Sequence, residues 1–230
     1  MISLIQQTNN LIGSPEDIEA LKTKDHARIL LISDSHGSFR LLNLIVSHFG
    51  KNCDALVLCG DTGRDFAELI ETAFDDENFK ETLPSVIAAV KGNCDPPAIP
   101  VSFAIRDGLN LFYRKSIILP EKQILTVNGQ NIFICHGNIE HVDYGYETLY
   151  MKMLSAECKA SVHGHTHVPQ NCHFDDNFRI INPGSISRPR EGAPETFAIL
   201  TVEKTFIDAA LIRINNCSGK PDSFSLLKNF

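Results

Sequence analysis

Five short apolar runs in this 230-residue sequence are each followed by side chains that can bind metal ions. The runs are rich in Ile, Val and Leu and occupy residues 28–32, 55–59, 85–90, 132–135 and 160–162. The side chains that follow them are two carboxylates, one amide and four imidazoles: Asp34, His36, Asp61, Asn93, His136, His165 and His167. In sheets flanked by helices, ligands bind beyond the carboxyl ends of the strands. We therefore expect these residues to converge on one site, although they span more than 130 positions.

The mixture of ligand types indicates which metals would bind. Oxygen and imidazole donors together suit Mn, Fe, Ni, Co or Zn, with Mn favoured. The set is too rich in nitrogen for Ca and a poor match to Mg. Seven protein ligands exceed the number that one catalytic ion uses. Two ions that share a carboxylate would explain the surplus, and such pairs, ~3.5–4 Å apart, hold both oxygens of an in-line phosphoryl displacement.

Taken singly, most of these motifs have an ordinary explanation. Asp34 and His36 could be loop residues ahead of a helix, and the Gly-Asp and Gly-Asn pairs could be plain turns. His136 alone says little. The Gly-His-Thr-His segment at 164–167 differs, because two imidazoles two residues apart beside a glycine are uncommon outside metal sites. The ordered set at strand ends favours metal binding over these alternatives.

Hydrophobic patterning predicts the elements that must position these side chains. Helical periodicity is expected at 15–22, after Ser38 as a cap, at 65–83 with an acidic interruption at 75–77, and at 146–158. Hairpins are expected at 123–135 around Asn128-Gly129, at 171–181 and at 196–214. The front half therefore contains βαβ units and the back half contains hairpins. Together they predict an α/β fold, a four-layer αββα sandwich of two mixed β-sheets flanked by helices.

Bulk composition narrows the class of protein. Hydrophobic residues make up 43% and charged residues 21%, which is typical of a globular chain. A net charge of -7 disfavours strong nucleic-acid binding, and no apolar run reaches the ~20 residues that span a membrane. An odd number of cysteines, seven, without any CxxC pair indicates a reducing compartment, so we expect a cytoplasmic protein, with homo-oligomerisation left open. We assign residues 1–26 to an N-terminal extension of unknown function and 27–230 to one domain.

The ordered motifs resemble the calcineurin-like metallophosphoesterase superfamily. Its pattern is D-x-H, GD, GN-x-[DE], a His and GH-x-H, and every position of that pattern is filled here between residues 34 and 167. The GNCD form at 92–95, the GHTH form and the Asn-Pro-Gly-Ser segment at 182–185, followed by Pro189-Arg190, resemble one subgroup. That subgroup contains the YfcE-like phosphodiesterases and the retromer scaffold subunit of the Vps type.

The resemblance implies a mechanism and a role for each residue. It implies that one ion is held by Asp34, His36, Asp61 and His167. It implies that a second ion is held by Asp61, Asn93, His136 and His165. Asp61, Asn93 and His136 would be the catalytic residues, with Asp61 bridging the ions. A hydroxide between the metals would attack a small phosphate ester, most favourably a diester or nucleotide. Arg190 would bind the phosphoryl oxygens, although it could equally face solvent, as could Arg188.

One departure from the family pattern concerns the leaving group. Many members have a His after Gly-Asn that donates a proton, whereas this chain has Cys94, a poor acid expected to serve packing. Asp95 could orient a neighbour, His141 could donate instead, and His163 could support the site or be structural. Without a strong acid, good leaving groups should react best. Two alternatives on the same fold are a phosphomonoesterase and a non-catalytic interaction scaffold. The retromer subunits, which are scaffolds of this kind, have lost metal-site histidines.

Overall fold

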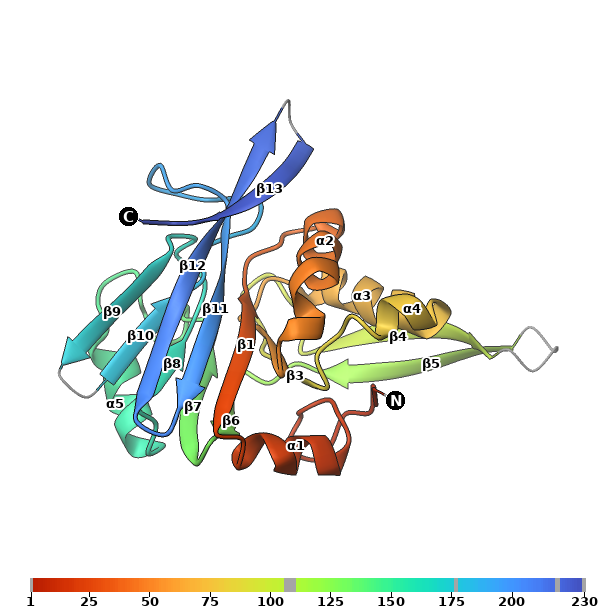
Figure 1. The fold of residues 1–230 in the computed structure, drawn as a ribbon, viewed down its shortest axis with the longest axis horizontal. Coiled ribbons are helices and arrows are strands. Elements are labelled where there is room, and N and C mark those ends of the chain that lie inside the picture. Colours follow the sequence, from red (N-terminus) through yellow and green to blue (C-terminus); the bar gives the residue numbers. More distant parts are fainter. Residues whose placement is uncertain (1, 106–110, 176–177, 218–219, 229–230) are drawn as a thin grey trace.

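Two mixed β-sheets lie face to face at the centre of the molecule (Figure 1). The computed structural model describes residues 2–105, 111–175, 178–217 and 220–228. The larger sheet has six strands in the order β13-β12-β11-β1-β2-β3, with these bounds: β13 Lys220–Leu226, β12 Phe206–Cys217, β11 Thr196–Glu203, β1 His26–Ile32, β2 Ala55–Leu58 and β3 Val86–Ala89. The second sheet has the order β6-β7-β8-β10-β9, with these bounds: β6 Lys122–Val127, β7 Gln130–Cys135, β8 Ala160–Val162, β10 Phe178–Asn182 and β9 Gln170–Asp175.

Both sheets contain a parallel centre and antiparallel edges. Strands β1, β2 and β3 run parallel, and β11, β12 and β13 join them as an antiparallel set. Strands β7, β8 and β10 are parallel, with β6 and β9 antiparallel at the two edges. Five of these six parallel strands, β1, β2, β3, β7 and β8, are those predicted to end in metal-binding residues, so the sheets bring those ends together.

Helices cover the outer face of each sheet, whereas the first helix of the chain packs against the core between the sheets. They have these bounds: α1 Pro15–Lys22, α2 Phe39–Phe49, α3 Gly63–Asp75, α4 Glu77–Lys80 and α5 Glu147–Ser155, with a 3-10 turn at Gly50–Asn52. Alternate residues of β1 show the layering, because Leu30 packs in a core with α2 and α3 whereas Leu31 packs in a core with the second sheet. A third core joins Leu149 of α5 to Phe133 on the outer face of the second sheet. The four-layer αββα prediction is confirmed.

Two local predictions need correction. Ser38 precedes α2, but its side chain makes no capping hydrogen bond. The helix expected at 65–83 is two helices, because the Asp76 carboxylate accepts hydrogen bonds from the backbone N–H groups of Asn78 and Phe79 and starts α4. The expected hairpins form, and β13 adds an edge strand that the pattern did not predict.

A separate two-stranded sheet was also not predicted. Strands β4 (Ala98–Ile105) and β5 (Leu111–Ile118) pair with each other and project from the body beside α3 and α4 (Figure 1). Pro100 lies inside β4, and proline is unusual within a sheet. A two-stranded hairpin tolerates it because each strand pairs along one side only.

The N-terminal residues pack against the body. Ile12 is 2% exposed and exchanges two backbone hydrogen bonds, both 2.8 Å, with Ile87 of the edge strand β3. Leu11, Ile18 and Leu21 are buried in the core between the sheets. This segment therefore covers an open sheet edge. No helix in the described ranges has both the length and the apolar character needed to cross a membrane.

Candidate metal centre

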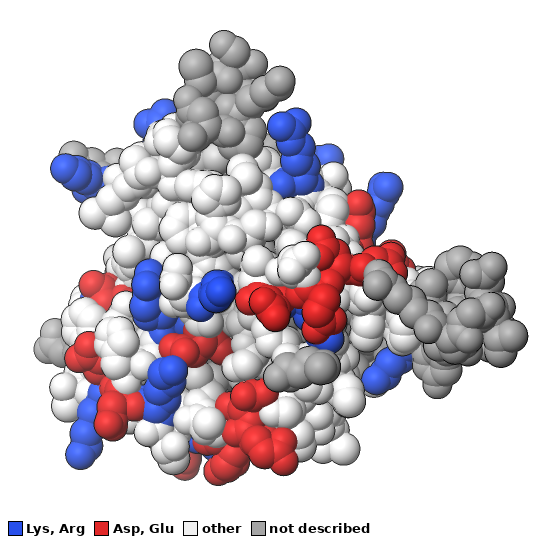
Figure 2. Space-filling model, turned by 45° about the vertical axis from the view of Figure 1, so that its right-hand side comes forward, with Lys and Arg blue, Asp and Glu red and all other residues white. Residues whose placement is uncertain are grey.

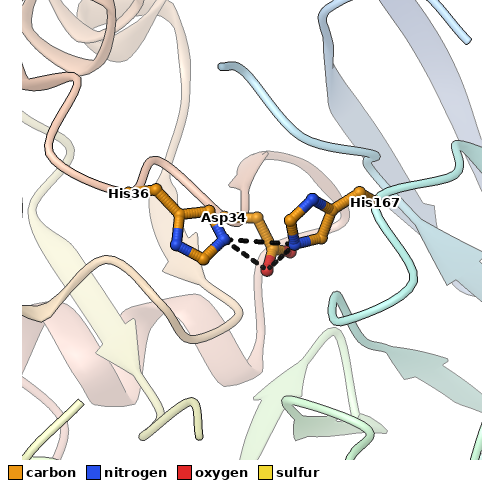
Figure 3. A group of neighbouring side chains, drawn as sticks. All are labelled: Asp34, His36 and His167. Atoms are coloured by element: carbon orange, nitrogen blue, oxygen red, sulfur yellow. Dashed lines mark hydrogen bonds and ion pairs between the residues drawn. The ribbon is translucent and has the colours of Figure 1, made fainter. Parts of the chain in front are cut away.

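The loops that follow β1 and β8 bring three predicted ligands together (Figure 3). The Nε2 atoms of His36 and His167 lie 3.1 Å apart. Asp34 Oδ1 lies 3.1 Å from His167 Nε2 and 3.7 Å from His36 Nε2. Asp34 is fully buried, whereas His36 is partly accessible from outside. Three ligand atoms that face one point at these separations could hold a metal ion.

The other predicted ligands form an adjacent group. Asn93 Oδ1 lies 3.1 Å from both His136 Nε2 and His165 Nδ1. The Asp61 carboxylate lies between the groups, because its Oδ2 atom is 3.6 Å from His136 Nε2 and 3.8 Å from His36 Nε2. The structure thus brings all seven predicted ligands to one place, with Asp61 in the position of a shared ligand.

One oxygen of the Asp34 carboxylate accepts no hydrogen bond in the described chain and faces the ring nitrogens of His167 and His36. Oδ2 accepts hydrogen bonds from Ser33 Oγ at 2.5 Å and the His165 backbone N–H at 3.1 Å, whereas buried Oδ1 has no hydrogen-bond partner. Burial alone would raise the pKa of Asp34, but interactions with His167 and His36 hold it well below its usual range. A buried, ionised oxygen without a donor is costly. A cation at this position would remove that cost, so the donor set fits a divalent metal.

Backbone carbonyls fix the tautomer of two imidazoles. His136 Nδ1 lies 2.8 Å from the Cys59 carbonyl oxygen, and His167 Nδ1 lies 2.5 Å from the Arg188 carbonyl oxygen. A ring nitrogen that donates to a carbonyl must carry the proton, which leaves Nε2 free to accept a metal. In both rings that Nε2 atom faces the cluster.

His165 has a carboxylate partner that sequence reasoning missed. Nε2 of His165 lies 2.8 Å from the Asp143 carboxylate, and Nδ1 faces the cluster. A carboxylate on the outer nitrogen orients a metal-binding histidine and makes it more basic. Asp143 lies in an irregular segment between β7 and α5, where no motif marks it.

Backbone strain is concentrated at the predicted ligands. Ten described non-glycine residues have positive φ, and half of them are predicted ligands: Asp34 (53°), His36 (45°), Asp61 (51°), His165 (69°) and His167 (61°). Each such residue costs roughly 1–3 kcal/mol and persists where the surroundings enforce it. Outliers of this kind gather at functional sites.

Two glycines in the motifs allow the loops to approach closely. A Cβ atom on Gly92 would lie 2.0 Å from Asp61 Oδ1, and one on Gly164 would lie 1.9 Å from Ser33 Oγ and 2.5 Å from Asp34 Oδ2. No other residue fits at either position without displacing a carboxylate. The glycines beside the ligands are therefore required by contact distance.

Two acidic residues tie the ligand loops to α3. Asp65, buried in the first turn of α3, accepts a hydrogen bond of 2.9 Å from the Gly37 N–H beside His36. Asp95 accepts bonds of 2.8 Å from the Gly63 N–H and 3.0 Å from the Gly92 N–H. Asp95 was expected to orient a neighbour, and its carboxylate holds the start of α3 against the loop that contains Gly92.

The Asn-Pro-Gly-Ser segment supports the loops from the second sheet. Asn182 is buried and donates a hydrogen bond of 2.8 Å to the Gly164 carbonyl oxygen. Ser185 donates one of 2.7 Å to the Asp34 carbonyl oxygen. These bonds help to hold the strained backbone of the ligands.

The remaining candidates lie around the cluster with different surroundings. His163 is buried next to Gly164, and burial lowers its pKa to about 4, so the ring is neutral. No described contact joins His141 to the seven ligands. Cys94 is exposed, which contradicts a packing role, and the six described cysteines are all free thiols.

Arginine side chains lie beside the cluster. Arg190 is exposed, and its backbone N–H donates a hydrogen bond of 3.3 Å to the His167 carbonyl oxygen. A cavity of about 330 Å³ adjoins the cluster, and two further arginines line it. Its lining residues are His36, Gly37, Asp61, Thr62, Gly63, Arg64, Asp65, Cys94, Asp95 and Arg188. Arg64 was not predicted from the sequence, since a lone arginine in a helix carries no motif.

Comparisons with known proteins agree with this geometry. The calcineurin-like phosphoesterase superfamily domain matches residues 28–205, a range that contains all seven ligands. The probable metallophosphoesterase YsnB of Bacillus subtilis is 28% identical over 193 residues, covering 83% of this chain and 92% of its own. The phosphodiesterase YfcE of Escherichia coli K12 is 28% identical over 179 residues, covering 75% and 86%. Vacuolar Protein Sorting 29 from Cryptosporidium parvum has a similar fold, with a TM-score of 0.62 at 16% identity over 90% of this chain and 100% of that one.

Proposed function

Because the chain belongs to the calcineurin-like phosphoesterase superfamily, we propose that it hydrolyses phosphodiester bonds with the help of two divalent metal ions, Mn being favoured. The substrates are small phosphodiesters or nucleotides. The names of YsnB and YfcE, a probable metallophosphoesterase and a phosphodiesterase, support the reaction class.

The position of Asp61 carries the proposal. Its carboxylate lies between His36 and His136, at 3.8 and 3.6 Å, and so can serve both ions. One ion would be held by Asp34, His36, Asp61 and His167, and the other by Asp61, Asn93, His136 and His165. When bound, the ions lower the pKa of water and neutralise charge on the phosphoryl oxygens.

Residues beside the cluster contact the phosphate and decide which leaving groups react fastest. Arg190 is proposed to contact the phosphoryl oxygens, and the exposed guanidinium of Arg188 lines the adjoining cavity. Cys94 lines the same cavity, but its interaction with Asp61, together with burial and nearby carboxylates, raises the pKa of the thiol to about 11. A thiol of that pKa is a weak proton donor at neutral pH. Leaving groups that depart without a proton should therefore react fastest.

Metal loading and hydrolysis together test the proposal. Protein stripped with a chelator and reconstituted with Mn should contain two ions per chain by elemental analysis and should hydrolyse bis(4-nitrophenyl) phosphate. Asp61→Asn should lose turnover by at least ~100-fold, whereas Asp25→Asn, a remote exposed control, should match the parent. Reconstituted protein without bound ions, or full turnover in Asp61→Asn, would refute the proposal.

Two other functions on this fold remain as alternatives. A phosphomonoesterase would hydrolyse 4-nitrophenyl phosphate faster than the diester at matched concentrations. A non-catalytic scaffold is compatible with the similarity to the fold of Vacuolar Protein Sorting 29, which is a similarity of fold alone. A scaffold would show no hydrolysis of either compound after loading with Mn, Ni or Zn.

A further inference from the structure

A second cavity continues from the metal cluster along α3. It has a volume of about 580 Å³ and lies between α3 and the start of the β4–β5 hairpin. Its lining residues are Gly63, Arg64, Ala67, Glu68, Glu71, Pro96, Ile99 and Pro100. Gly63 and Arg64 also line the cavity beside His36 and Asp61. We call this second cavity the groove; it adjoins the cavity beside the predicted ligands at Gly63 and Arg64.

Contacts between α3 and the hairpin hold the groove open. Glu71 on α3 accepts a hydrogen bond of 2.7 Å from the Ser102 backbone N–H in β4. The rings of Phe74 and Phe103 stack with centroids 4.0 Å apart and planes at 18°. Ile99 is 2% exposed and belongs to the main core. The groove is thus a fixed part of the fold and does not depend on a ligand for its shape.

Arg64 lies where the two cavities meet. Its side chain is exposed and makes no hydrogen bond or ion pair with any residue in the described ranges. The backbone beside it is fixed, because the Gly63 N–H donates to Asp95. An unpaired guanidinium beside a metal-ligand cluster is suited to bind a phosphate oxygen with two hydrogen bonds.

The rest of the groove has a different character. Ala67, Pro96 and Pro100 supply apolar contact, and the side chain of Glu68 is exposed without a partner among the described residues. Acidic side chains also gather on this face of the molecule, next to the projecting hairpin (Figure 2). A second phosphate would be repelled here, whereas an apolar group with N–H donors would be accommodated.

We infer that this groove binds the nucleoside substituent of a phosphodiester, and that the preferred substrate is a nucleotide diester with an amino-bearing base. The inference rests on the proposed function, since the scissile phosphate lies at the metal cluster. Arg64 contacts that phosphate, the flat base lies against Ala67 and the prolines, and Glu68 accepts from the amino group of the base. The volume of about 580 Å³ is in the range of small-ligand sites and fits one nucleoside.

The test compares esters that share one leaving group. Adenosine 5′-(4-nitrophenyl phosphate), 4-nitrophenylphosphorylcholine and methyl 4-nitrophenyl phosphate all release 4-nitrophenolate, so differences in kcat/KM report on the second substituent. The parent should prefer the adenosine ester over the methyl ester by at least ~10-fold. Ala67→Phe, which fills the groove, should reduce kcat/KM for the adenosine ester by ~10-fold and leave the methyl ester within about twofold of the parent.

Charge variants locate the two ends of the substituent. Glu68→Gln should weaken the preference for adenosine, Arg64→Ala should lower kcat/KM for all three esters, and Arg213→Ala, an exposed arginine on β12, should change nothing. Equal use of the adenosine and methyl esters, or a preference for the choline ester, would overturn the inference while leaving the diesterase activity intact. Hydrolysis of none of the three esters would instead refute the proposed function. Circular dichroism of each variant checks that it folds.

Discussion

Gly92→Ala should disable the metal centre through a single added methyl group. A Cβ atom at this position would lie 2.0 Å from Asp61 Oδ1 and 2.3 Å from the Asp61 backbone nitrogen, against a minimum of about 3.0 Å for real contacts. One of these groups must therefore move by about 1 Å. Gly92 does not have positive φ, so the substitution adds a steric clash without adding backbone strain.

The displacement falls on Asp61, the ligand that the two ions are proposed to share. The Asp61 carboxylate also accepts a hydrogen bond of 2.8 Å from the Cys94 N–H, so it cannot move without breaking that bond. A misplacement of ~1 Å at a reacting centre can cost ~100-fold in rate. We expect kcat/KM for bis(4-nitrophenyl) phosphate to fall by at least that factor and Mn affinity to fall by ~10-fold or more.

A control substitution at a second glycine separates the effect of the steric clash with Asp61 from a general loss of stability. Gly129 lies in the hairpin turn at φ 68°, and a Cβ atom added there would meet no described atom within 4 Å, so Gly129→Ala adds strain but no clash. That control should lower the melting temperature and leave Mn affinity and kcat/KM unchanged. Calorimetric titration of chelator-stripped protein with Mn, alongside the hydrolysis assay, measures both variants. Parent-like Mn affinity in a folded Gly92→Ala protein would refute the reasoning about Asp61.

Three further predictions concern surrounding residues. Asp143→Asn should weaken Mn binding by ~10–100-fold in calorimetry by losing the carboxylate that orients His165; unchanged affinity would exclude that role. Burial raises the pKa of Tyr146 to about 12, whereas the same side chain ionises near pH 10 in the unfolded chain, so the free energy of unfolding should fall as pH rises from 10 to 12. Tyr146→Phe should reduce that fall in denaturant titrations. The same dependence of the free energy of unfolding on pH in parent and variant would contradict this expectation. Ile12→Pro removes the N–H bonded to the Ile87 carbonyl oxygen and should cost about 1–3 kcal/mol, lowering the melting temperature with Mn affinity retained. An unchanged melting temperature would show that this hydrogen bond does not stabilise the sheet edge.

The clustering of the seven side chains could be predicted because each follows a strand that is easy to recognise. Parallel strands bring their carboxyl ends to one edge, so order along the chain was enough to predict convergence. The layering followed from the same strands, because alternate residues of β1 enter different cores. Asn128-Gly129 was recognisable for a local reason, since both residues adopt positive φ in the turn.

Features that depend on long-range contacts were not predictable. Asp143 matters only because His165, 22 positions later, turns its Nε2 atom toward it. The β4–β5 hairpin was missed because Pro100 interrupts the strand pattern and because the contacts that dock it come from α3. Cys94 was expected inside a core, yet its loop faces the cavity beside the cluster. In each case the partner is distant in sequence and no periodicity marks the pair.

The left-handed backbone of five ligands has a consequence for how the protein would tolerate change. At roughly 1 kcal/mol or more for each residue, these loops hold several kcal/mol that the remaining structure must supply. Replacing the partly accessible His36 by glycine would relieve part of that load. The His36→Gly variant should melt at higher temperature than the chelator-stripped parent while losing affinity for ions. Selection for thermostability alone would therefore favour loss of these residues, and their retention among related proteins would indicate that the metal centre is still needed.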